Sequence, residues 1–557
     1  MPEPTFALGI DYGTESARAL LVDVADGREA ATAVYQYSNG VITERLPGTR
    51  TRLPAHDWAL QDPEDYLRAL DATVPACLAQ AGVRGEQVIG IATDFTACTM
   101  LPARKDGTPL CLLPEFRAQP HAWVKLWKHH AAQPEADRVN ETARRMEEPW
   151  LERYGGKISS EWFFPKALQI LQEAPQVYAA ADRLIEAADW IIWQLCGRET
   201  RNLCTAGYKA IWSKRDGFPR KEFFAALDPR FADVIDSKMS RDILALGARA
   251  GGLTEPMAAR LGLAAGTAVA AGNVDAHVAV PACTVTGPGK MVMIMGTSIC
   301  HMVCGTADRF VPGQCGVVED GILPGLHGFE AGQSAVGDIF AWFVRTCVPG
   351  SYQTAARRRK IGVHDLLAEK AAAYKPGQTG LLALDWWNGN RSVLVDANLT
   401  GLMLGMHLGT KPEEMYRALL EATAFGTYKI IRTFEAGGVP IEEIYCCGGL
   451  PERNDPLMQI YSDVSGRSFK IARSAQTCAL GSAMHAAVAA GRAAGGYDTI
   501  QEAALRMAGV RDKTYQPSAD AHAAYEKIFA EYDLLHDYFG RGANDAMKRL
   551  KALKGVE

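Results

Sequence analysis

The sequence predicts an α/β protein that consists of two lobes with a cleft between them. Its 557 residues are too many for a single hydrophobic core. Short apolar runs alternate with stretches of helical periodicity, which indicates mixed layers of strands and helices. Two strand-turn-strand segments, at residues 6–24 and 290–305, repeat one design in widely separated parts of the chain.

The composition excludes several classes of protein. Hydrophobic residues make up 48% of the chain and charged residues 22%, as in ordinary globular proteins rather than disordered or fibrous ones. The formal net charge of -5 lacks the basic character of a nucleic-acid-binding protein. The N-terminus has no secretory-signal pattern, and no run of about 18 apolar residues occurs. We therefore expect a cytoplasmic protein that binds neither nucleic acid nor a membrane.

The thirteen cysteines do not predict a metal site. Most lie within apolar segments, so we expect free, buried thiols. Cys300 and Cys304 are four positions apart and Cys446 and Cys447 are adjacent, but neither pair has a second pair at zinc-site spacing. His129 and His130 lie in a polar stretch after Lys128, and we expect them on a solvated helix face.

The N-terminal half is expected to end at a hinge. The apolar residues 88–92 and 268–271 predict two strands. The proline- and glycine-rich segment TVTGPGK predicts a flexible connection between the lobes. A boundary there divides the chain into an N-terminal domain of residues 1–287 and a C-terminal domain of residues 288–557.

The C-terminal half contains three predicted helices. Residues 412–425 and 480–490 have helical periodicity, and the second of these is rich in small residues that allow close packing. Apolar side chains recur at helical spacing in residues 520–539. This tail is therefore expected to be a packed terminal helix.

The turn of the first hairpin has the composition of a phosphate-binding loop. Its strand ends in the carboxylate of Asp11, and Gly13 lets a ligand approach the backbone closely. The hydroxyl groups of Thr14 and Ser16 follow as hydrogen-bonding groups. Asp11 is suited to hold Mg²⁺ through water, because Mg²⁺ keeps much of its hydration shell. An ordinary hairpin turn with a capping aspartate would give the same pattern.

The turn of the second hairpin, Gly296-Thr297, makes a phosphate site more specific. Two such turns in separate lobes can close on one triphosphate from opposite sides. The chain has no G-x-x-x-x-G-K-[ST] motif, so a P-loop fold is disfavoured. The sequence therefore predicts that hairpins hold the phosphates.

A third glycine turn lies in residues 441–464. A buried strand runs into Gly448-Gly449, and a helix is expected to begin near Asn454 or the residue after it. Paired glycines leave space for a base and a ribose. A plain strand-to-helix turn is the alternative interpretation.

Three polar residues are candidates for the acceptor side of the site. Asp275 follows an apolar strand just before the hinge and is the candidate general base. A helix cap is the alternative role for an aspartate in this position. Lys209 and Glu330 stand in apolar, small-residue segments, where sugar hydroxyls could use them or where each could form a structural ion pair.

Together these motifs resemble those of the FGGY family of carbohydrate kinases. GIDYGTESARALLVD is similar to the family's first phosphate motif, MGTSICH to its second, and CCGGLPERNDPLMQIYSDV to its adenosine motif. GNVDAH is similar to the segment that carries the catalytic base. The resemblance covers nearly the whole chain and implies two lobes of the actin-like, ribonuclease-H-like ATPase fold.

The resemblance implies a role for each candidate residue. Asp275 would be the catalytic base, Asp11 would assist Mg²⁺, and ATP would be the phosphate donor. The residues implied in nucleotide binding are Gly13, Thr14, Ser16, Arg18, Gly296, Thr297, Gly448, Gly449 and Asn454.

Longer stretches are similar to the branch of this family that phosphorylates L-ribulose. They include TDFTACTMLP, YGGKISSEWFFPKALQI, TAGYKAIW and GFEAGQSAVGD. The implied reaction is ATP-dependent phosphorylation of L-ribulose to L-ribulose 5-phosphate, as in L-arabinose catabolism. The residues implied to hold the ketopentose are Ala97, Lys209, Asp275 and Glu330, with Trp127 as a further wall of the pocket.

Two positions depart from the wider family pattern. Gln169 stands three residues after Lys166, where many sugar kinases carry Trp, and Leu419 stands where the signature prefers a smaller or β-branched residue. These departures point to a particular branch of the family, and neither position is a candidate site residue.

Other functions stay open at this point. A kinase for D-ribulose, xylulose or glycerol would share the same motifs, and an actin-like ATPase without a small-molecule acceptor would share the lobes. Lys209, Asp275 and Glu330 argue against the ATPase. The sequence leaves the oligomeric state open, with a homodimer as one alternative.

Overall fold

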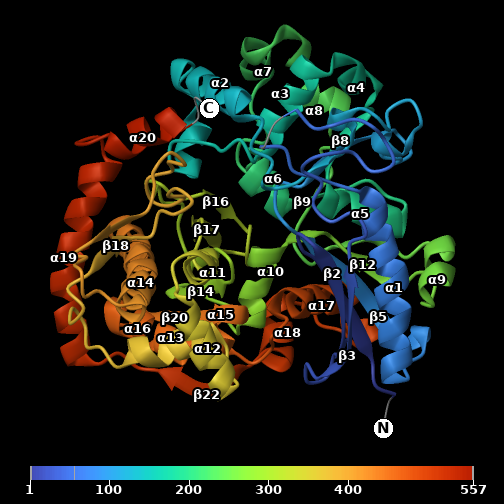
Figure 1. Ribbon diagram of the computed structural model, residues 1–557. Coiled ribbons are helices and arrows are strands. Elements are labelled where there is room, and N and C mark those ends of the chain that lie inside the picture. Colours follow the sequence, from blue (N-terminus) through green and yellow to red (C-terminus); the bar gives the residue numbers. More distant parts are fainter. Residues whose placement is uncertain (1–2, 55–56, 555–557) are drawn as a thin grey trace.

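Two seven-stranded sheets form the core of the protein in this computed structural model, which describes residues 3–54 and 57–554 (Figure 1). The first sheet contains β1 (Phe6–Tyr12), β2 (Ser16–Asp23), β3 (Glu29–Gln36), β5 (Val88–Phe95), β11 (Arg249–Gly252), β12 (Ala268–Ala270) and β13 (Asn273–Val274). The second contains β14 (Lys290–Met295), β15 (Ile299–Gly305), β16 (Gly316–Glu319), β17 (His327–Gln333), β20 (Glu443–Cys447), β21 (Phe469–Ala472) and β22 (Val510–Tyr515). We call the parts built around them the first and second lobes.

The two sheets share one pattern of strand pairing. β1 pairs with β2 in antiparallel and with β5 in parallel orientation, and β14 pairs in the same way with β15 and β20. The next strands outward, β12 and β21, are again parallel, and β11 and β22 follow antiparallel to them. Both predicted hairpins are confirmed, and each occupies the equivalent position in its own lobe.

Helices cover the sheets and connect the strands. Those of the first half are α1 (Pro63–Ala81), α2 (Gln133–Arg145), α3 (Phe163–Glu173), α4 (Pro175–Ala180), α5 (Ala187–Cys196), α6 (Leu203–Lys209), α7 (Lys221–Leu227), α8 (Val234–Lys238), α9 (Glu255–Leu261) and α10 (Asp275–Ala282). Those of the second half are α11 (Gly337–Thr346), α12 (Gly350–Arg359), α13 (Val363–Ala372), α14 (Pro412–Ala436), α15 (Gly449–Arg453), α16 (Asp455–Ser465), α17 (Thr477–Ala490), α18 (Ile500–Met507), α19 (Ala519–Gly540) and α20 (Ala546–Lys554). None of the helices within the described ranges has the length and apolar character needed to cross a membrane.

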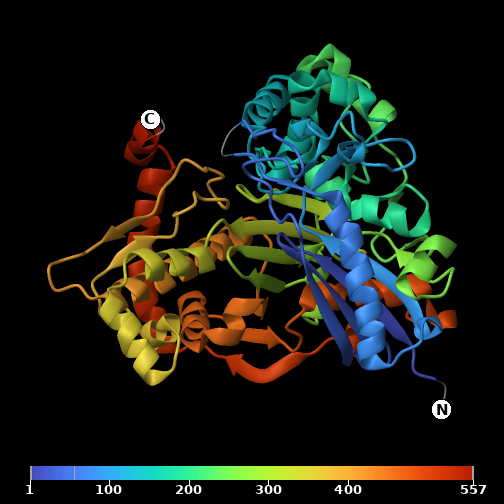
Figure 2. The ribbon, with the colours of Figure 1, turned by 45° about the vertical axis from the view of Figure 1, so that its right-hand side comes forward.

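α17 packs on the first sheet although it lies between β21 and β22 of the second in the chain, so it joins the two lobes (Figure 2). Glycines make this contact possible. A Cβ at Gly9 would lie 1.8 Å from the carbonyl oxygen of Ala479, and one at Gly90 would lie 2.3 Å from that of Ala486. A Cβ at Gly481 of the helix would lie 2.0 Å from the carbonyl oxygen of Val278 in α10. The small residues predicted to allow close packing therefore do so on both sides of α17.

A helical part of the first lobe lies above the junction with the second lobe in Figure 2 (cyan to green). Its sheet consists of β4 (Leu60–Gln61), β6 (Met100–Ala103), β7 (Val124–Lys125) and β8 (Arg183–Glu186). Helices α2, α3, α4, α7 and α8 enclose a hydrophobic cluster beside it, which we call the upper cluster.

The prediction for one histidine of this part is wrong. His129 is 0% exposed instead of lying on a solvated face, and it precedes α2 rather than forming part of a helix. Its ring stands edge-on to Trp58 and lies 3.1 Å from the side-chain oxygen of Gln169. The polar residues around it in the sequence hid this contact, because the partners come from distant segments.

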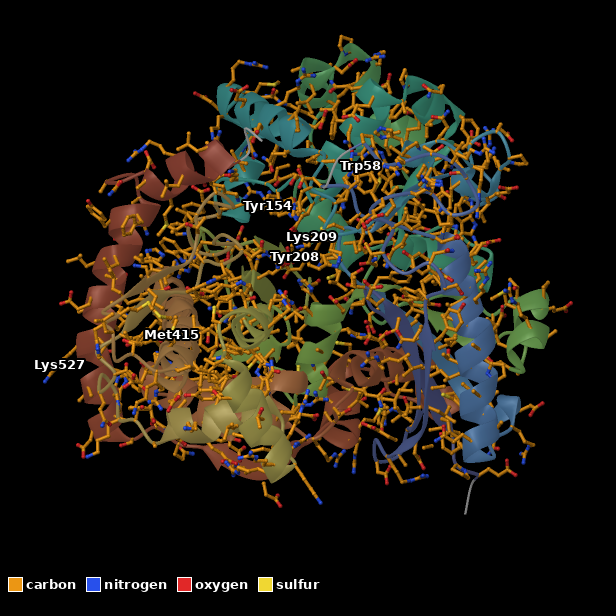
Figure 3. The ribbon with its side chains drawn as sticks, in the orientation of Figure 1. Trp58, Tyr154, Tyr208, Lys209, Met415 and Lys527 are labelled. Atoms are coloured by element: carbon orange, nitrogen blue, oxygen red, sulfur yellow. The ribbon has the colours of Figure 1, made fainter. Side chains whose placement is uncertain are left out.

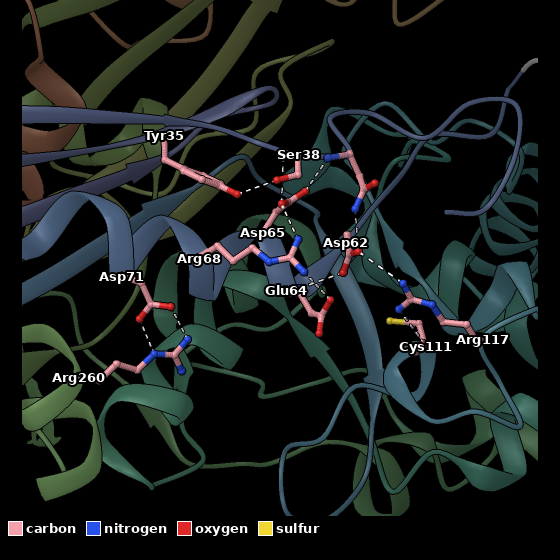
Figure 4. Close-up of polar contacts among 11 residues, drawn as sticks. Tyr35, Ser38, Asp62, Glu64, Asp65, Arg68, Asp71, Cys111, Arg117 and Arg260 are labelled. Carbon is pink, nitrogen blue, oxygen red and sulfur yellow. Dashed lines mark hydrogen bonds and ion pairs between the residues drawn. The ribbon is translucent and has the colours of Figure 1, made fainter. Parts of the chain in front are cut away.

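Polar contacts fix the segment before β4 on the N-terminal turn of α1 (Figure 4). The carboxylate of Asp65 accepts hydrogen bonds from the backbone N–H groups of Ser38 and Asn39, each at 3.0 Å. The Asp62 side chain caps the helix at the backbone N–H of Glu64. This segment leads into β4, whose Gln61 donates a hydrogen bond to the first predicted phosphate turn.

The C-terminal tail forms the predicted packed helix. α19 buries Tyr525, Phe529, Tyr532 and His536 against the second lobe. The structure adds α20, whose Lys548 forms an ion pair with Asp396 at 3.1 Å.

Candidate active site

Three aspartates meet at one end of the first sheet. Asp11 in β1 and Asp94 in β5 are paired in register, and Asn273 in β13 pairs with Asp94 from the other side. Asp275 begins α10 directly after β13, so it lies at the same carboxyl ends of parallel strands. Ligands of open α/β sheets bind at such ends.

Asp275 has the electrostatic character of a general base. Burial raises its pKa to about 7, and the charge of Asp11 acts in the same direction. Its side chain also accepts a hydrogen bond from the backbone N–H of Ala276 at 2.6 Å, as a residue in the first turn of a helix does. A pKa near neutrality suits a carboxylate that accepts a proton from a hydroxyl group.

Sequence reasoning missed Asp94. This residue is buried, and one of its oxygens accepts a hydrogen bond from the Ser482 hydroxyl of α17 at 2.6 Å. Its other oxygen has no hydrogen-bond partner among the described residues. Burial and the neighbouring Asp11 raise the pKa of Asp94 well above its usual range. A carboxylate at the end of an apolar strand was the available signal, as it was for Asp11.

The oxygens of Asp11 and Asp94 and the sulfur of Cys478 lie within 4.8 Å of one another. The carboxylates are suitable ligands for Mg²⁺, whereas a thiol is not. Arg18, the cross-strand partner of Asp11 in the hairpin, places its Nε 3.5 Å from an Asp11 oxygen. The donor set thus fits a magnesium ion at Asp11 and leaves Cys478 as a free thiol.

In each of the two predicted phosphate turns, the backbone N–H of the glycine closes the turn. In the first, the backbone N–H of Gly13 donates to the carbonyl oxygen of Ser16 at 2.9 Å. In the second, the backbone N–H of Gly296 donates to that of Ser298, also at 2.9 Å. Gly296 and Thr297 are exposed, so the second turn is open to a ligand.

Neighbouring elements hold both turns. The backbone N–H of Val336, at the start of α11, donates to the carbonyl oxygen of Thr297 at 2.7 Å. In the first turn the Thr14 hydroxyl accepts a hydrogen bond from the indole of Trp127 at 3.1 Å, and its carbonyl oxygen accepts one from Gln61 at 2.7 Å. Trp127, predicted as a wall of the sugar pocket, therefore also supports the phosphate turn.

The predicted adenosine turn lies beside the second phosphate turn, because β20 is the parallel neighbour of β14. Gly448 has φ +97°, and a Cβ there would lie 2.5 Å from the carbonyl oxygen of Met295. A Cβ at Gly449 would meet no atom of the described residues within 4 Å, so this position has open space beside it. Asn454 caps α16 by accepting a hydrogen bond from the backbone N–H of Leu457 at 3.0 Å.

Lys209 and Glu330 form a buried ion pair between the lobes. The ammonium nitrogen of Lys209, at the end of α6, lies 3.0 and 2.8 Å from the two carboxylate oxygens of Glu330 in β17. Figure 3 places Lys209 and Tyr208 at the junction of the two lobes. Burial alone would raise the pKa of Glu330, but the charges and hydrogen bonds of Lys209 and His277 together outweigh it and keep that pKa below its usual range. His277 of α10 adds a contact with the same carboxylate at 3.3 Å.

Another ion pair that crosses between the lobes was not predicted. Arg391 of the second lobe lies 3.6 Å from a carboxylate oxygen of Glu161 in the first. Its side chain lies over Gly332, where a Cβ would approach it to 3.0 Å. Gly332 is two residues after Glu330 in β17, so Arg391 lies over the face of this strand that carries the Glu330 side chain. A lone arginine in a loop gives no signal for such a role in the sequence.

The structure brings most of the predicted residues into three groups. The aspartates and the first glycine turn lie at one end of the first sheet, and the turns after β14 and β20 lie side by side in the second. The Lys209–Glu330 pair forms the third group, between the lobes. Ala97 is partly buried and packs between the upper cluster and the core that contains α10 and α17. The Asn454 side chain caps its own helix, and of the candidates it has the least direct connection to the other site residues.

Known proteins resemble this chain over its whole length. The family model described as the N-terminal domain of the FGGY family of carbohydrate kinases matches residues 6–281, and that of the C-terminal domain matches residues 291–490. The chain is 59% identical over 549 residues to the ribulokinase of Geobacillus thermodenitrificans, covering 99% of this chain and 97% of that one. It is 51% identical over 553 residues to the ribulokinase of Mycolicibacterium smegmatis, covering 99% and 97%.

Solved structures share the fold. A xylulose kinase from Rhodospirillum rubrum matches with a TM-score of 0.77 and 20% identity, over 96% of this chain and 99% of that one. A gluconate kinase from Lactobacillus acidophilus matches with a TM-score of 0.79 and 16% identity, over 97% and 99%. These matches confirm the predicted two-lobed α/β fold of a sugar kinase. Together with the two family models, they show that the chain belongs to the FGGY family of carbohydrate kinases.

Proposed function

We propose that this kinase transfers the γ-phosphate of ATP to ribulose, with L-ribulose as the preferred substrate and L-ribulose 5-phosphate as the product. The observation that carries the proposal is the buried Lys209–Glu330 pair together with the partly buried Asp275, whose pKa both of these charges affect. Such convergent polar side chains suit a polyhydroxylated acceptor. The likeness to ribulokinases at 51–59% identity over nearly the whole chain supports ribulose as that acceptor.

In the proposed reaction Asp275 accepts the proton of the terminal sugar hydroxyl. The freed oxygen attacks the γ-phosphorus, and the bond between that phosphorus and the bridging oxygen of ADP breaks. The N–H groups and hydroxyls of the turns around Gly13 and Gly296 would orient the phosphates. Lys209 and Glu330 would exchange part of their mutual ion pair for hydrogen bonds to sugar hydroxyls.

Asp11 would hold Mg²⁺, through water, beside the first phosphate turn. When bound, this ion neutralises charge on the phosphate oxygens. Asp94 lies next to Asp11 and would orient it. The nucleotide base would lie near Gly448 and Gly449.

The chain is proposed to divide at the hinge into domains of residues 1–287 and 288–557, with closure of the lobes excluding water from the reaction. We further propose that the enzyme works in the cytoplasm, where ATP and sugar are both present. A homodimer is an alternative to the monomer.

A sugar panel tests the proposal. Purified enzyme, Mg²⁺ and ATP are combined with L-ribulose, D-ribulose, L-xylulose, D-xylulose, glycerol or no sugar, and ADP release is followed by a coupled assay. We expect L-ribulose to give the highest kcat/KM. Turnover with another acceptor alone would contradict the substrate, and ATP hydrolysis that no sugar increases would contradict the kinase reaction.

A further inference from the structure

A buried lysine lies in the upper part of the first lobe and takes no part in the reaction described above. Lys166 in α3 is 0% exposed. Its ammonium group donates to two backbone carbonyl oxygens, that of Cys98 at 2.7 Å and that of Leu126 at 2.8 Å. Lysine is rarely buried so completely unless its charge is paired.

Both carbonyl groups belong to segments of the proposed sugar pocket. Cys98 directly follows Ala97, the residue proposed to contact the ketopentose. Cys98 has φ +59°, in the left-handed region that non-glycine residues occupy at a cost in energy. A hydrogen bond from a charged group to its carbonyl oxygen therefore helps to hold a strained loop in shape.

The second carbonyl group leads to the phosphate turn. Leu126 directly precedes Trp127, whose indole donates to the Thr14 hydroxyl at 3.1 Å. Lys166 thus joins the loop of residues 96–99, which contains Ala97, to the segment that contains Trp127. The Trp127 indole connects this segment to the first phosphate turn. One ammonium group therefore connects the two proposed walls of the acceptor site.

Core packing alone does not account for a lysine in this position. Burial lowers the pKa of Lys166 to about 8, so placing its charge here costs free energy. A hydrophobic residue of similar volume would avoid this cost. What the lysine provides is a pair of charge-assisted hydrogen bonds with fixed geometry.

We infer that Lys166 is a positioning residue for the sugar, because it fixes the loop of Ala97 relative to the segment of Trp127. The inference rests on the proposed function, and the family resemblance assigns Ala97 to the acceptor pocket. Because Lys166 contacts the Ala97 loop directly and the first phosphate turn only through Trp127, loss of the ammonium group should weaken sugar binding far more than nucleotide binding.

The chain offers a matched control in Lys125. This lysine is also 0% exposed, and burial lowers its pKa to about 7. Its ammonium group donates to the side-chain oxygen of Gln169 at 3.1 Å and lies 3.3 Å from His129 Nε2. Within the described part of the chain, none of its hydrogen bonds goes to the loop of Ala97. Removing this charge should therefore affect stability without affecting the loop.

The test compares Lys166→Met and Lys125→Met with the wild-type enzyme, using L-ribulose and ATP as varied substrates. We expect Lys166→Met to raise the KM for L-ribulose by about 10- to 100-fold, as loss of a charged hydrogen bond does. The KM for ATP should change by less than about twofold. Lys125→Met should lower the Tm while leaving both KM values near those of the wild type.

A purely structural role for Lys166 would give a different result. If its sugar KM changes no more than that of Lys125→Met, or if both KM values rise together, the inference is wrong. Should Lys166→Met fail to fold, Lys166→Gln keeps one donor group and is measured in the same way. Its sugar KM should rise severalfold, and an unchanged value would overturn the inference. Absence of ketopentose turnover in the wild-type enzyme would instead contradict the proposed function.

Discussion

The charges around Asp275 determine its protonation state, and this state determines whether it can act as the proposed base. Burial and the charge of Asp11 favour its protonated form more strongly than the charge of Lys209 opposes it. Only the deprotonated form can accept a proton from the sugar. The same environment that makes Asp275 a stronger base therefore also removes the active form at acidic pH.

This balance predicts the direction of the pH dependence. Because the pKa of Asp275 is raised to about 7, the carboxylate is populated above that pH and lost below it. We expect kcat/KM for L-ribulose to rise about tenfold per pH unit up to roughly pH 7 and then to level off. A rate that stays constant between about pH 5.5 and 8 would show that no group with this pKa controls the reaction.

The residues that could be predicted from the sequence carry a local signal. Asp11, Gly13 and Gly296 stand in short turns whose composition is informative, and Asp275 follows an apolar strand. Asp94 carries the same signal as Asp11, a carboxylate at the end of an apolar strand, although it was missed. Arg391 carries no such signal, because its role depends on a partner distant in the chain. Lys209 and Glu330 were predicted as polar residues in apolar surroundings, but only the fold shows that they pair with each other.

At the scale of elements, α17 is the structural link between the lobes. It rests on β1 and β5 through glycines, and on α10 through its own small residues. α10 begins with Asp275, and α17 carries the hydroxyl group that holds Asp94. The packing of these two helices therefore determines where the aspartates lie.

The contact between β1 and α17 predicts a severe effect of a single methyl group. In Gly9→Ala the new Cβ would meet the carbonyl oxygen of Ala479 at 1.8 Å. The contact could be relieved only if the backbone of β1 or of α17 moved. We expect the variant to lose several kcal/mol of stability or to fail to fold.

Gly350→Ala serves as the control for this prediction, because a Cβ there meets no described atom within 4 Å. Its Tm should stay close to that of the wild type, as measured by thermal unfolding. A normal Tm for Gly9→Ala would show that α17 does not pack on β1 at this distance.

The elements differ in how well the sequence predicts them. The hairpins and the helices of residues 412–425 and 480–490 have strong periodicity and are confirmed. The sheet of the upper part was not predicted, because β4 and β7 contain two residues each and come from separate segments. Such short strands form when the surrounding tertiary structure brings them together, so periodicity cannot reveal them.

For the whole molecule, the contacts between the lobes matter most. Ion pairs of both directions cross the junction. Lys209 and Lys214 of the first lobe meet Glu330 and Glu319 of the second, and Glu161 of the first lobe meets Arg391 of the second. Each of these pairs joins side chains of different lobes, so a change in the relative position of the lobes would change these contacts.

The buried pair predicts a non-additive effect on stability. Lys209→Met leaves the Glu330 carboxylate buried without its ion-pair partner, with His277 at 3.3 Å, which we expect to cost about 3–5 kcal/mol. The double variant Lys209→Met/Glu330→Met removes both charges and should recover much of that loss. Thermal unfolding measures the difference, and Lys221→Met, which removes an exposed ion pair, serves as the control. If the two single effects simply add, the pair does not couple the lobes.

The central claim is that Asp275 acts as the base of a sugar kinase, and one measurement tests it most directly. Sugar-dependent ADP release by Asp275→Asn is compared with that of the wild type, while nucleotide binding is measured on the same samples. The account predicts a loss of about 100-fold or more in turnover with ATP binding preserved. Near-normal turnover in a variant that still binds ATP would contradict it.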